Sequence, residues 1–172
     1  GAQVMTNVTP LYGSSYFDSG SGTTTAGNDG GDAIGWVPLG GLFLTVPLTE
    51  SVTVGFGTFS YFGLGLSYDN DWVGRYYVQE NQLQGLTLMP SISLKLNEQW
   101  SVGAGLNAMY GTMMDQVAVN NVLPPGASDG QLKFQDTDWG FGGEAGILWQ
   151  PAKDTRFGLT YLSPVDLSFK DS

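Results

Sequence analysis

The sequence contains no cysteine and no histidine, and these two absences remove much of the chemistry that enzymes use. Without cysteine, these residues form no disulfide, offer no thiol nucleophile and cannot hold a cysteine-ligated zinc ion. Without histidine, they lack the commonest general base and the commonest metal ligand. We therefore predict that the chain is not an enzyme and has no catalytic residue, no metal and no cofactor.

Charged residues are also scarce, at 13% of the chain, about half the ~25% that is usual in a soluble globular domain. Six Lys and Arg residues against sixteen Asp and Glu residues give a formal net charge of -10 at pH 7. A surface that binds nucleic acid needs clustered Lys and Arg to neutralise phosphates. We therefore expect no nucleic acid among the partners.

Long hydrophobic runs are missing as well. No stretch of about 18 apolar residues is present, which excludes a transmembrane helix. The N-terminus lacks the basic and apolar regions of a signal peptide, so in an exported protein we expect that segment to have been removed. Glycine, with 26 residues, and aromatic residues, at 13%, are abundant instead, and together they favour strands over helices.

The clearest strand pattern lies in residues 85–96. Apolar residues and one proline occupy the even positions from Leu86 to Leu96, whereas Gly, Thr, Met, Ser and Lys occupy the odd positions. Such strict alternation indicates a β-strand with two different faces. The pattern resumes after a short turn at 97–99 and continues from Trp100 to Gly111, so this region predicts a hairpin.

Two further pairs of segments repeat the design, and a first strand is expected near residues 3–17. The pairs are 36–46 with 52–59, and 139–150 with a strand that begins at 156 and continues toward Phe169. Short turns at 47–51, 97–99 and 151–155 contrast with long connections near 18–33, 60–82 and 112–135. We predict one β-barrel segment over residues 1–172 with about seven antiparallel strands, short periplasmic turns and long extracellular loops.

The second strand face separates a membrane barrel from a soluble sheet. A soluble sheet would carry Lys, Glu and Arg there, but this face holds mainly Gly, Ser, Thr, Asn and Met, which suit a crowded lumen. The apolar face would then contact lipid, where an unpaired polar group is costly. Trp100 and Trp149 flank short turns, as expected for a periplasmic aromatic belt. We predict an all-β, antiparallel transmembrane β-barrel in the bacterial outer membrane; a soluble secreted β-protein is the alternative.

About seven strands cannot stand alone in lipid as an open sheet, because both edges would present unpaired backbone groups. Either partner chains close the sheet, or these residues belong to a longer barrel. The second interpretation is favoured, and it makes the remainder of the same barrel an expected partner.

Several blocks carry a family resemblance. The stretch YDNDWVGRY at 68–76 resembles the FadL family of outer-membrane long-chain fatty-acid and aromatic-hydrocarbon transporters. Similar blocks are LNEQWSVGAGLNA at 96–108, DWGFGGEAGILW at 138–149 and TRFGLTY at 155–161. Their order and spacing are similar to the family's over nearly the whole chain.

The resemblance implies a fourteen-stranded barrel that is plugged by an N-terminal hatch. It also implies that ligand is captured at extracellular loops and released sideways through an opening in the wall. The hatch, with its Asn-Pro-Ala motif, would precede these residues, and the C-terminal strands would follow them. The predicted function is passive uptake of long-chain fatty acids or similar hydrophobic small molecules. A non-transport barrel for adhesion or packing, filled by its own side chains, is the alternative.

Six side chains are predicted to face the lumen and to contact the ligand as it passes. They are Met89, Asn107, Met109, Glu144, Leu148 and Leu162. Methionine adapts to varied apolar ligands, which favours a hydrophobic passage over a water-filled pore. The competing interpretations are that the apolar residues fill space against the hatch, and that Glu144 joins a structural network with Lys95, Arg156 and Asn107.

The second long connection is unusually apolar and is predicted to form a capture surface for hydrophobic ligand. Its residues are Phe62, Leu64, Leu66 and Trp72. Packing against neighbouring loops is the alternative. Asp29 and Asp32 lie in a first connection that lacks the closing Glu of a calcium loop, so a solvated turn is favoured there. Outer-membrane lipid and lipopolysaccharide are the expected surroundings, and divalent bridging to lipopolysaccharide stays open.

Overall fold

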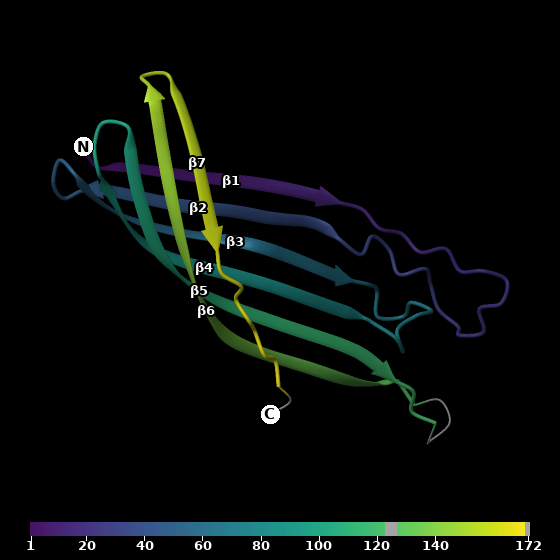
Figure 1. The fold of residues 1–172 in the computed structure, drawn as a ribbon. Coiled ribbons are helices and arrows are strands. Elements are labelled where there is room, and N and C mark those ends of the chain that lie inside the picture. The colour runs from purple at the N-terminus through teal and green to yellow at the C-terminus, as the bar shows by residue number, and fades with distance from the viewer. Residues whose placement is uncertain (123–126, 171–172) are drawn as a thin grey trace.

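The computed structural model describes residues 1–122 and 127–170, and in them seven strands form one antiparallel sheet in chain order (Figure 1). The strands are β1 (Gln3–Gly13), β2 (Gly35–Pro47), β3 (Val52–Ser67), β4 (Glu80–Lys95), β5 (Trp100–Val119), β6 (Gly130–Ala152) and β7 (Thr155–Leu162). Each strand pairs with the next along the chain, as the predicted hairpins require. No helix in these residues is long and apolar enough to span a membrane.

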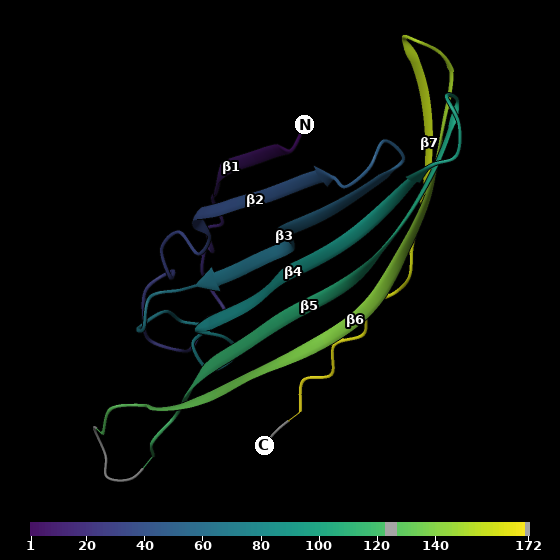
Figure 2. The same ribbon diagram turned by 90° about the vertical axis from the view of Figure 1, so that its left-hand side faces the viewer.

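The sheet is strongly curled, and β5 and β6 bend toward β7 to make half of a barrel (Figure 2). β1 and β7 are its two edges, and within the described residues each pairs with a single neighbour. An all-β antiparallel fold of seven strands therefore agrees with the alternation in the sequence.

The two faces of the sheet differ sharply in exposure. On the concave face, Asn107 is 2% exposed and Met109 is 7% exposed. On the convex face, Leu106, Phe141 and Leu159 are 67%, 72% and 73% exposed. Curvature explains the contrast, because side chains converge on the inside of a curled sheet and spread apart on the outside. The convex face is consequently an apolar surface suited to lipid.

The second and third long connections are shorter than predicted, because the strands beside them extend further, whereas the first spans 14–34 and is longer than the predicted 18–33 because β1 ends at Gly13. The second spans 68–79 because β3 continues to Ser67, after a bulge between Phe59 and Phe62 that shifts its register against β4. The third spans 120–129 because β5 and β6 stay paired as far as Val119 and Gly130. Residues 123–126, inside this third connection, lie outside the described residues.

The lipid-facing assignment of the convex face predicts the cost of placing a charge there. Leu106 lies six residues along β5 from Trp100, roughly 15 Å above the short-turn rim and near the expected middle of the apolar band. Replacing Leu106 with Arg should lower the free energy of unfolding of the full-length protein in bilayers by ~2–4 kcal/mol.

Val122→Arg is the matched control, because Val122 is exposed in a connection beyond the end of β5. Its cost should be ~0–1 kcal/mol. Both values follow from urea titration of unfolding and refolding in lipid vesicles. Equal costs at the two positions would contradict the membrane assignment.

Candidate ligand passage and wall opening

Aromatic and methionine side chains gather on the concave face at mid-height. The rings of Phe43 and Phe59 stack with centroids 5.7 Å apart. A Cβ placed on Gly57 would lie 3.2 Å from Phe43 Cδ1 and 3.6 Å from Met89 Cε, so these side chains crowd over one glycine. We name Phe43, Phe59, Phe62, Met89 and Met109, which the register places on this face, the inner apolar cluster.

Two fully buried polar groups lie beside this cluster. Thr87 is 0% exposed, and neither its Oγ1 nor the Oδ1 of Asn107 has a hydrogen-bond partner among the described residues. Thr87 is the register partner of Met109, and Asn107 precedes Met109 by two residues in β5, so Thr87 and Asn107 are diagonal neighbours on one face. Leaving a buried oxygen unpaired costs about 1–3 kcal/mol, which favours a role for these atoms in ligand contact or in assembly.

Glu144 extends the diagonal row of polar groups toward the short-turn rim. It is paired in register with Gly105, and a Cβ on Gly105 would lie 2.5 Å from Glu144 Oε1, so glycine leaves the space that this side chain fills. Lys95 does not reach Glu144, because its Nζ pairs with Glu98 Oε1 at 2.8 Å in the adjacent turn. The structure therefore does not show the predicted contact between Glu144 and Lys95.

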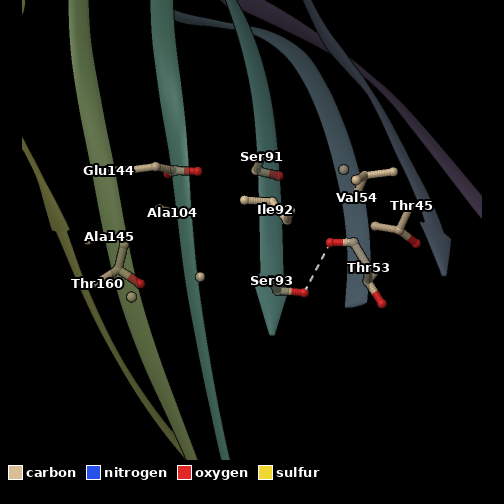
Figure 3. Close-up of a pocket in the computed structure, with 13 residues that line it drawn as sticks. Thr45, Thr53, Val54, Ser91, Ile92, Ser93, Ala104, Glu144, Ala145 and Thr160 are labelled. Carbon is tan, nitrogen blue, oxygen red and sulfur yellow. Dashed lines mark hydrogen bonds between the residues drawn. The ribbon is translucent and has the colours of Figure 1, made fainter. Parts of the chain in front are cut away.

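A hollow of about 230 Å³ lies beside Glu144 (Figure 3). Hydroxyl groups line much of it, from Thr45, Thr53, Ser91, Ser93 and Thr160. Ser93 Oγ donates a hydrogen bond to the Thr53 carbonyl at 3.5 Å. Figure 3 shows the Glu144 side chain lying across β5 in the direction of Ser91. The inner surface thus changes from apolar at mid-height to hydroxyl-rich near the short-turn rim.

The register places all six predicted lumen residues on the concave face, but it gathers only some of them. Met89, Asn107 and Met109 lie together on β4 and β5. Leu148 and Leu162 lie on β6 and β7 toward the sheet edge, where Leu162 is the register partner of Glu144.

The prediction that Trp72 forms part of an exposed capture surface is wrong, because Trp72 is only 6% exposed. Its ring stacks on Tyr68 with centroids 4.0 Å apart, and Phe17 of the first connection packs edge-on at 5.6 Å. The indole Nε1 donates to the Val78 carbonyl at 2.7 Å. Trp72 is therefore the core of a layer formed by the connections, which is the alternative that the sequence left open.

The other three predicted capture residues lie on β3 and not in a connection. The ring of Phe62 covers Gly85, where a Cβ would meet Phe62 Cζ at 2.7 Å, so Phe62 faces the lumen. Leu64 is exposed, whereas Leu66 is partly covered. A loop assignment failed here because the bulge interrupts the alternation that would have identified the strand.

The three long connections are tied to one another by polar contacts. Val73 N donates to the Asn28 carbonyl at 2.9 Å, which joins the first connection to the second. Arg75 Nε pairs with Asp129 Oδ2 at 2.7 Å, which joins the second to the third. The Arg75 guanidinium, followed by the Tyr76 hydroxyl, hydrogen-bonds the Asp129 carboxylate and lowers its pKa.

The sheet has a gap in its hydrogen-bond ladder between β2 and β3. The two strands pair from Pro47↔Thr53 to Gly41↔Phe59, and the pairing then stops. Among the described residues, backbone hydrogen bonding between these two segments resumes at the long-connection rim, where Ser67 N donates to the Ala33 carbonyl at 2.8 Å. We name this unpaired stretch of the ladder, residues 34–40 and 60–66, the β2–β3 window.

Apolar side chains and glycine border the β2–β3 window. Val37, Pro38 and Gly63 line two cavities of about 370 and 170 Å³ beside it. A Cβ on Gly63 would be 3.7 Å from Leu39 Cδ2, an ordinary contact, and it would meet no closer atom. Phe62 lines the larger cavity, so the window adjoins the inner apolar cluster.

Sequence reasoning missed both Thr87 and the window, although each left a signal. Thr87 stands between inward positions 85 and 89 in the alternating run, where a threonine among glycine and methionine marks a polar group on an apolar face. Pro38 has no backbone N–H, so a proline within a strand indicates a place where the ladder is incomplete.

The model of one protein family, described as outer membrane protein transport protein (OMPP1/FadL/TodX), matches residues 2–172. The chain belongs to this family. It is 29% identical over 153 residues to the long-chain fatty acid transport protein of Escherichia coli O6:H1 (strain CFT073) and 31% identical over 150 residues to that of Salmonella typhi. Each match covers 78% of this chain and 34% of the relative. Outer membrane protein P1 of Haemophilus influenzae is 29% identical over 156 residues, which cover 76% of this chain and 34% of that protein.

Solved structures of family members have the same fold. A Pseudomonas aeruginosa FadL homologue superposes with a TM-score of 0.71 at 21% identity, over 95% of this chain and 43% of that chain. The Ralstonia pickettii toluene transporter TbuX gives a TM-score of 0.60 at 19% identity, over 95% of this chain and 46% of that one. The resemblance to FadL proteins, the barrel fold class and the outer-membrane location are thereby confirmed. The chain spans about a third of the length of the curated relatives that it matches.

The Arg75–Asp129 pair predicts how the connection layer responds to acid. The ion pair stabilises the layer above the ordinary carboxyl pKa of ~3.9, and this stabilisation is lost as pH falls through the lowered pKa that Asp129 has in the folded protein. Arg75→Gln should make hydrogen exchange of residues 68–79 severalfold faster at pH 7, with a smaller additional rise in acid.

Lys95→Gln serves as the control, because it removes the exposed Lys95–Glu98 pair at the opposite rim and should leave exchange in 68–79 unchanged. Exchange rates corrected for the intrinsic effect of pH provide the measurement. Unchanged exchange in Arg75→Gln would show that the pair does not hold the layer together.

Proposed function

We propose that this chain forms about half of the wall of an outer-membrane channel for passive uptake of long-chain fatty acids or similar hydrophobic small molecules. The observation that carries the proposal is the β2–β3 window beside the inner apolar cluster, since together they offer an apolar route from lumen to lipid. The names of the Escherichia coli and Salmonella typhi relatives support the substrate class.

The route follows from the distribution of apolar surface. Ligand reaches the lumen from the long-connection rim, contacts Met89 and Met109, and leaves sideways through the window between Leu39 and Gly63. Methionine suits such a passage because its flexible thioether packs against apolar molecules of different shapes. The driving force is transfer from water to an apolar environment, about 0.8 kcal/mol for each buried CH₂ group, so the route needs no covalent step.

The alternatives are less well supported. A closed eight-stranded barrel filled by its own side chains would need β1 and β7 to meet, but the described sheet is open between them. A soluble β-protein would expose Leu106, Phe141 and Leu159 to water as part of one apolar face. No observation in the described residues therefore favours the closed eight-stranded barrel or the soluble β-protein.

The direct test compares uptake of radiolabelled oleate by cells that carry the full-length parent gene, cells deleted for it and complemented cells. We expect uptake to fall severalfold on deletion and to return on complementation. Unchanged uptake in the deletion strain, with the protein detected in the outer membrane of the parent, would overturn fatty acids as the substrate. Labelled toluene in the same cells then tests the neutral aromatic class.

The window makes a more specific prediction. Gly63→Phe in the full-length protein should fill the β2–β3 window and lower oleate uptake severalfold, because Gly63 has an open space that is limited only by Leu39. Gly143→Phe is the matched control. Gly143 also lies on a strand with its nearest atom, Gly105 O, at 3.7 Å, but it is on β6 away from the window.

Both variants should keep the heat-modifiable migration of a folded barrel on electrophoresis, which separates blockage from misfolding. If Gly63→Phe is folded and transports oleate as well as Gly143→Phe, ligand does not leave through the β2–β3 window.

A further inference from the structure

Beyond the last strand, the chain passes over the inner face of the wall. Residues 163–170, which we name the inner strap, leave the end of β7 and run beside β6 toward the long-connection rim (Figure 2). A Cβ placed on Gly140 would lie 2.5 Å from Val165 Cγ1, and one placed on Gly111 would lie 2.6 Å from Leu167 Cδ1. Both glycines belong to the concave face. The inner strap therefore lies on the lumen side of β5 and β6.

The edge of β6 that the inner strap passes is capped by side chains of β6 itself. Gly143 bonds to the first residue of the inner strap through both its N–H and its carbonyl. Main-chain groups of alternate residues point to the same edge of a strand, so those of Thr137 and Trp139 point the same way as those of Gly143. Thr137 N donates to Asp136 Oδ1 at 2.7 Å, and Trp139 N donates to Asp138 Oδ1 at 2.9 Å. These two N–H groups have partners without a neighbouring strand, which lets the chain leave the wall here.

The same two carboxylates hold the inner strap. Asp138 Oδ2 accepts a hydrogen bond from Ser168 N at 2.7 Å, and Asp136 Oδ2 accepts one from Lys170 N at 2.6 Å. Residues 164–167, between these bonds and Gly143, form no ladder with the described strands. A segment attached at its two ends, with few backbone hydrogen bonds between them, opens more easily than a paired strand.

The side chains of the inner strap alternate in exposure. The half-buried side chains, which lie against the wall, are Ser163, Val165, Leu167 and Phe169. The exposed residues are Pro164, Asp166, Ser168 and Lys170. The docked inner strap therefore turns a polar and charged side to the lumen and keeps its apolar side chains on the wall. The alternation that predicted a strand continuing toward Phe169 belongs to a segment that has left the sheet.

The wall beneath the inner strap is a groove of glycines, Gly111, Gly140 and Gly142. Hydrocarbon groups of the inner strap fill the space that these glycines leave, and a Cβ on Gly142 would lie 2.8 Å from Val165 Cγ2. Gly140 is the register partner of Met109, so the groove continues into the inner apolar cluster. With the inner strap moved away, the groove would offer apolar contacts directly beside Met109.

We propose that the inner strap is a gate that competes with hydrophobic ligand for the groove over Gly111, Gly140 and Gly142. An apolar ligand displaces the docked inner strap because its hydrocarbon takes over the contacts that Val165 and Leu167 make. The groove is open to ligand only in the undocked state, so binding shifts the equilibrium toward that state. This inference rests on the proposed function for the class of ligand.

The first experiment measures displacement of the inner strap by thiol labelling. The sequence has no cysteine, so a cysteine introduced by Val165→Cys is the only thiol among these residues. We expect a maleimide reagent to label Val165→Cys in the full-length protein severalfold faster with oleate than without it. Asp166→Cys is the matched control, because its side chain is already exposed on the opposite side of the inner strap. Its labelling rate should not change.

The carboxylate attachment is tested in the same assay. Adding Asp138→Ala to Val165→Cys removes the partner of Ser168 N, so labelling without oleate should become severalfold faster. Asp154→Ala is the control, because Asp154 lies in the exposed turn between β6 and β7, and it should have no effect.

The second experiment locks the inner strap in place. The contact between Val165 Cγ1 and the position of a Cβ on Gly140 is close enough for a disulfide in Gly140→Cys/Val165→Cys. We expect oxidation to lower oleate uptake severalfold and reduction to restore it. Val102→Cys/Ile147→Cys is the control, because these register partners join two wall strands. Its oxidation should leave uptake unchanged.

The proposal is overturned if the locking disulfide does not form in the folded protein, if the locked protein takes up oleate at the parental rate, or if oleate leaves the labelling of Val165→Cys unchanged. Normal uptake by the locked protein would remove the gate and leave the transport proposal standing. Faster labelling with oleate in a protein whose deletion does not lower uptake would support the gate and contradict transport of fatty acids.

Discussion

Inside a bilayer the backbone has no water to bond with, so every N–H and C=O group of a spanning segment must find a partner within the protein. This requirement accounts for the ladder that joins β1 to β7, which is interrupted between β2 and β3, and it is the reason why the outward side chains can be almost wholly apolar. It also means that the free edges of β1 and β7 must be paired by other strands. The two solved structures on which this sheet superposes are longer, because the superposition covers 43% and 46% of those chains.

The β2–β3 window departs from this requirement, and its composition shows how the cost is reduced. Pro38 contributes no N–H that would need a partner, and Gly63 allows the side chain of Leu39 to cover the backbone. The paired residues Gly41↔Phe59 below and the Ser67–Ala33 bond above keep the opening from spreading along the strands. The ladder gap is thus framed by backbone hydrogen bonds at both ends and bordered by apolar side chains and glycine between them.

Much of the fold could be predicted from the sequence because apolar and small or polar residues alternate regularly along the strands. The predictions failed at places where this alternation is interrupted or where no local pattern exists. The hairpin of β4 and β5 was evident because each side chain type repeats every second residue. The end of β3 was not, because the bulge after Phe59 exchanges the two faces and makes residues 60–67 look like a loop. Trp72 was misassigned for a different reason: its burial depends on Phe17 and Val78, and no local pattern reveals which connection covers another.

The burial of Trp72 also bears on where a hydrophobic ligand would first meet the protein in the proposed uptake route. Within the described residues, the connection layer has an aromatic core in which Trp72 packs against Tyr68 and Phe17. Large apolar side chains exposed beside the window are Trp36 and Leu64, which stand on the two strands that fail to pair. The same gap in the ladder that opens the wall therefore concentrates apolar surface at its margin, and initial contact and sideways release would use neighbouring parts of β2 and β3.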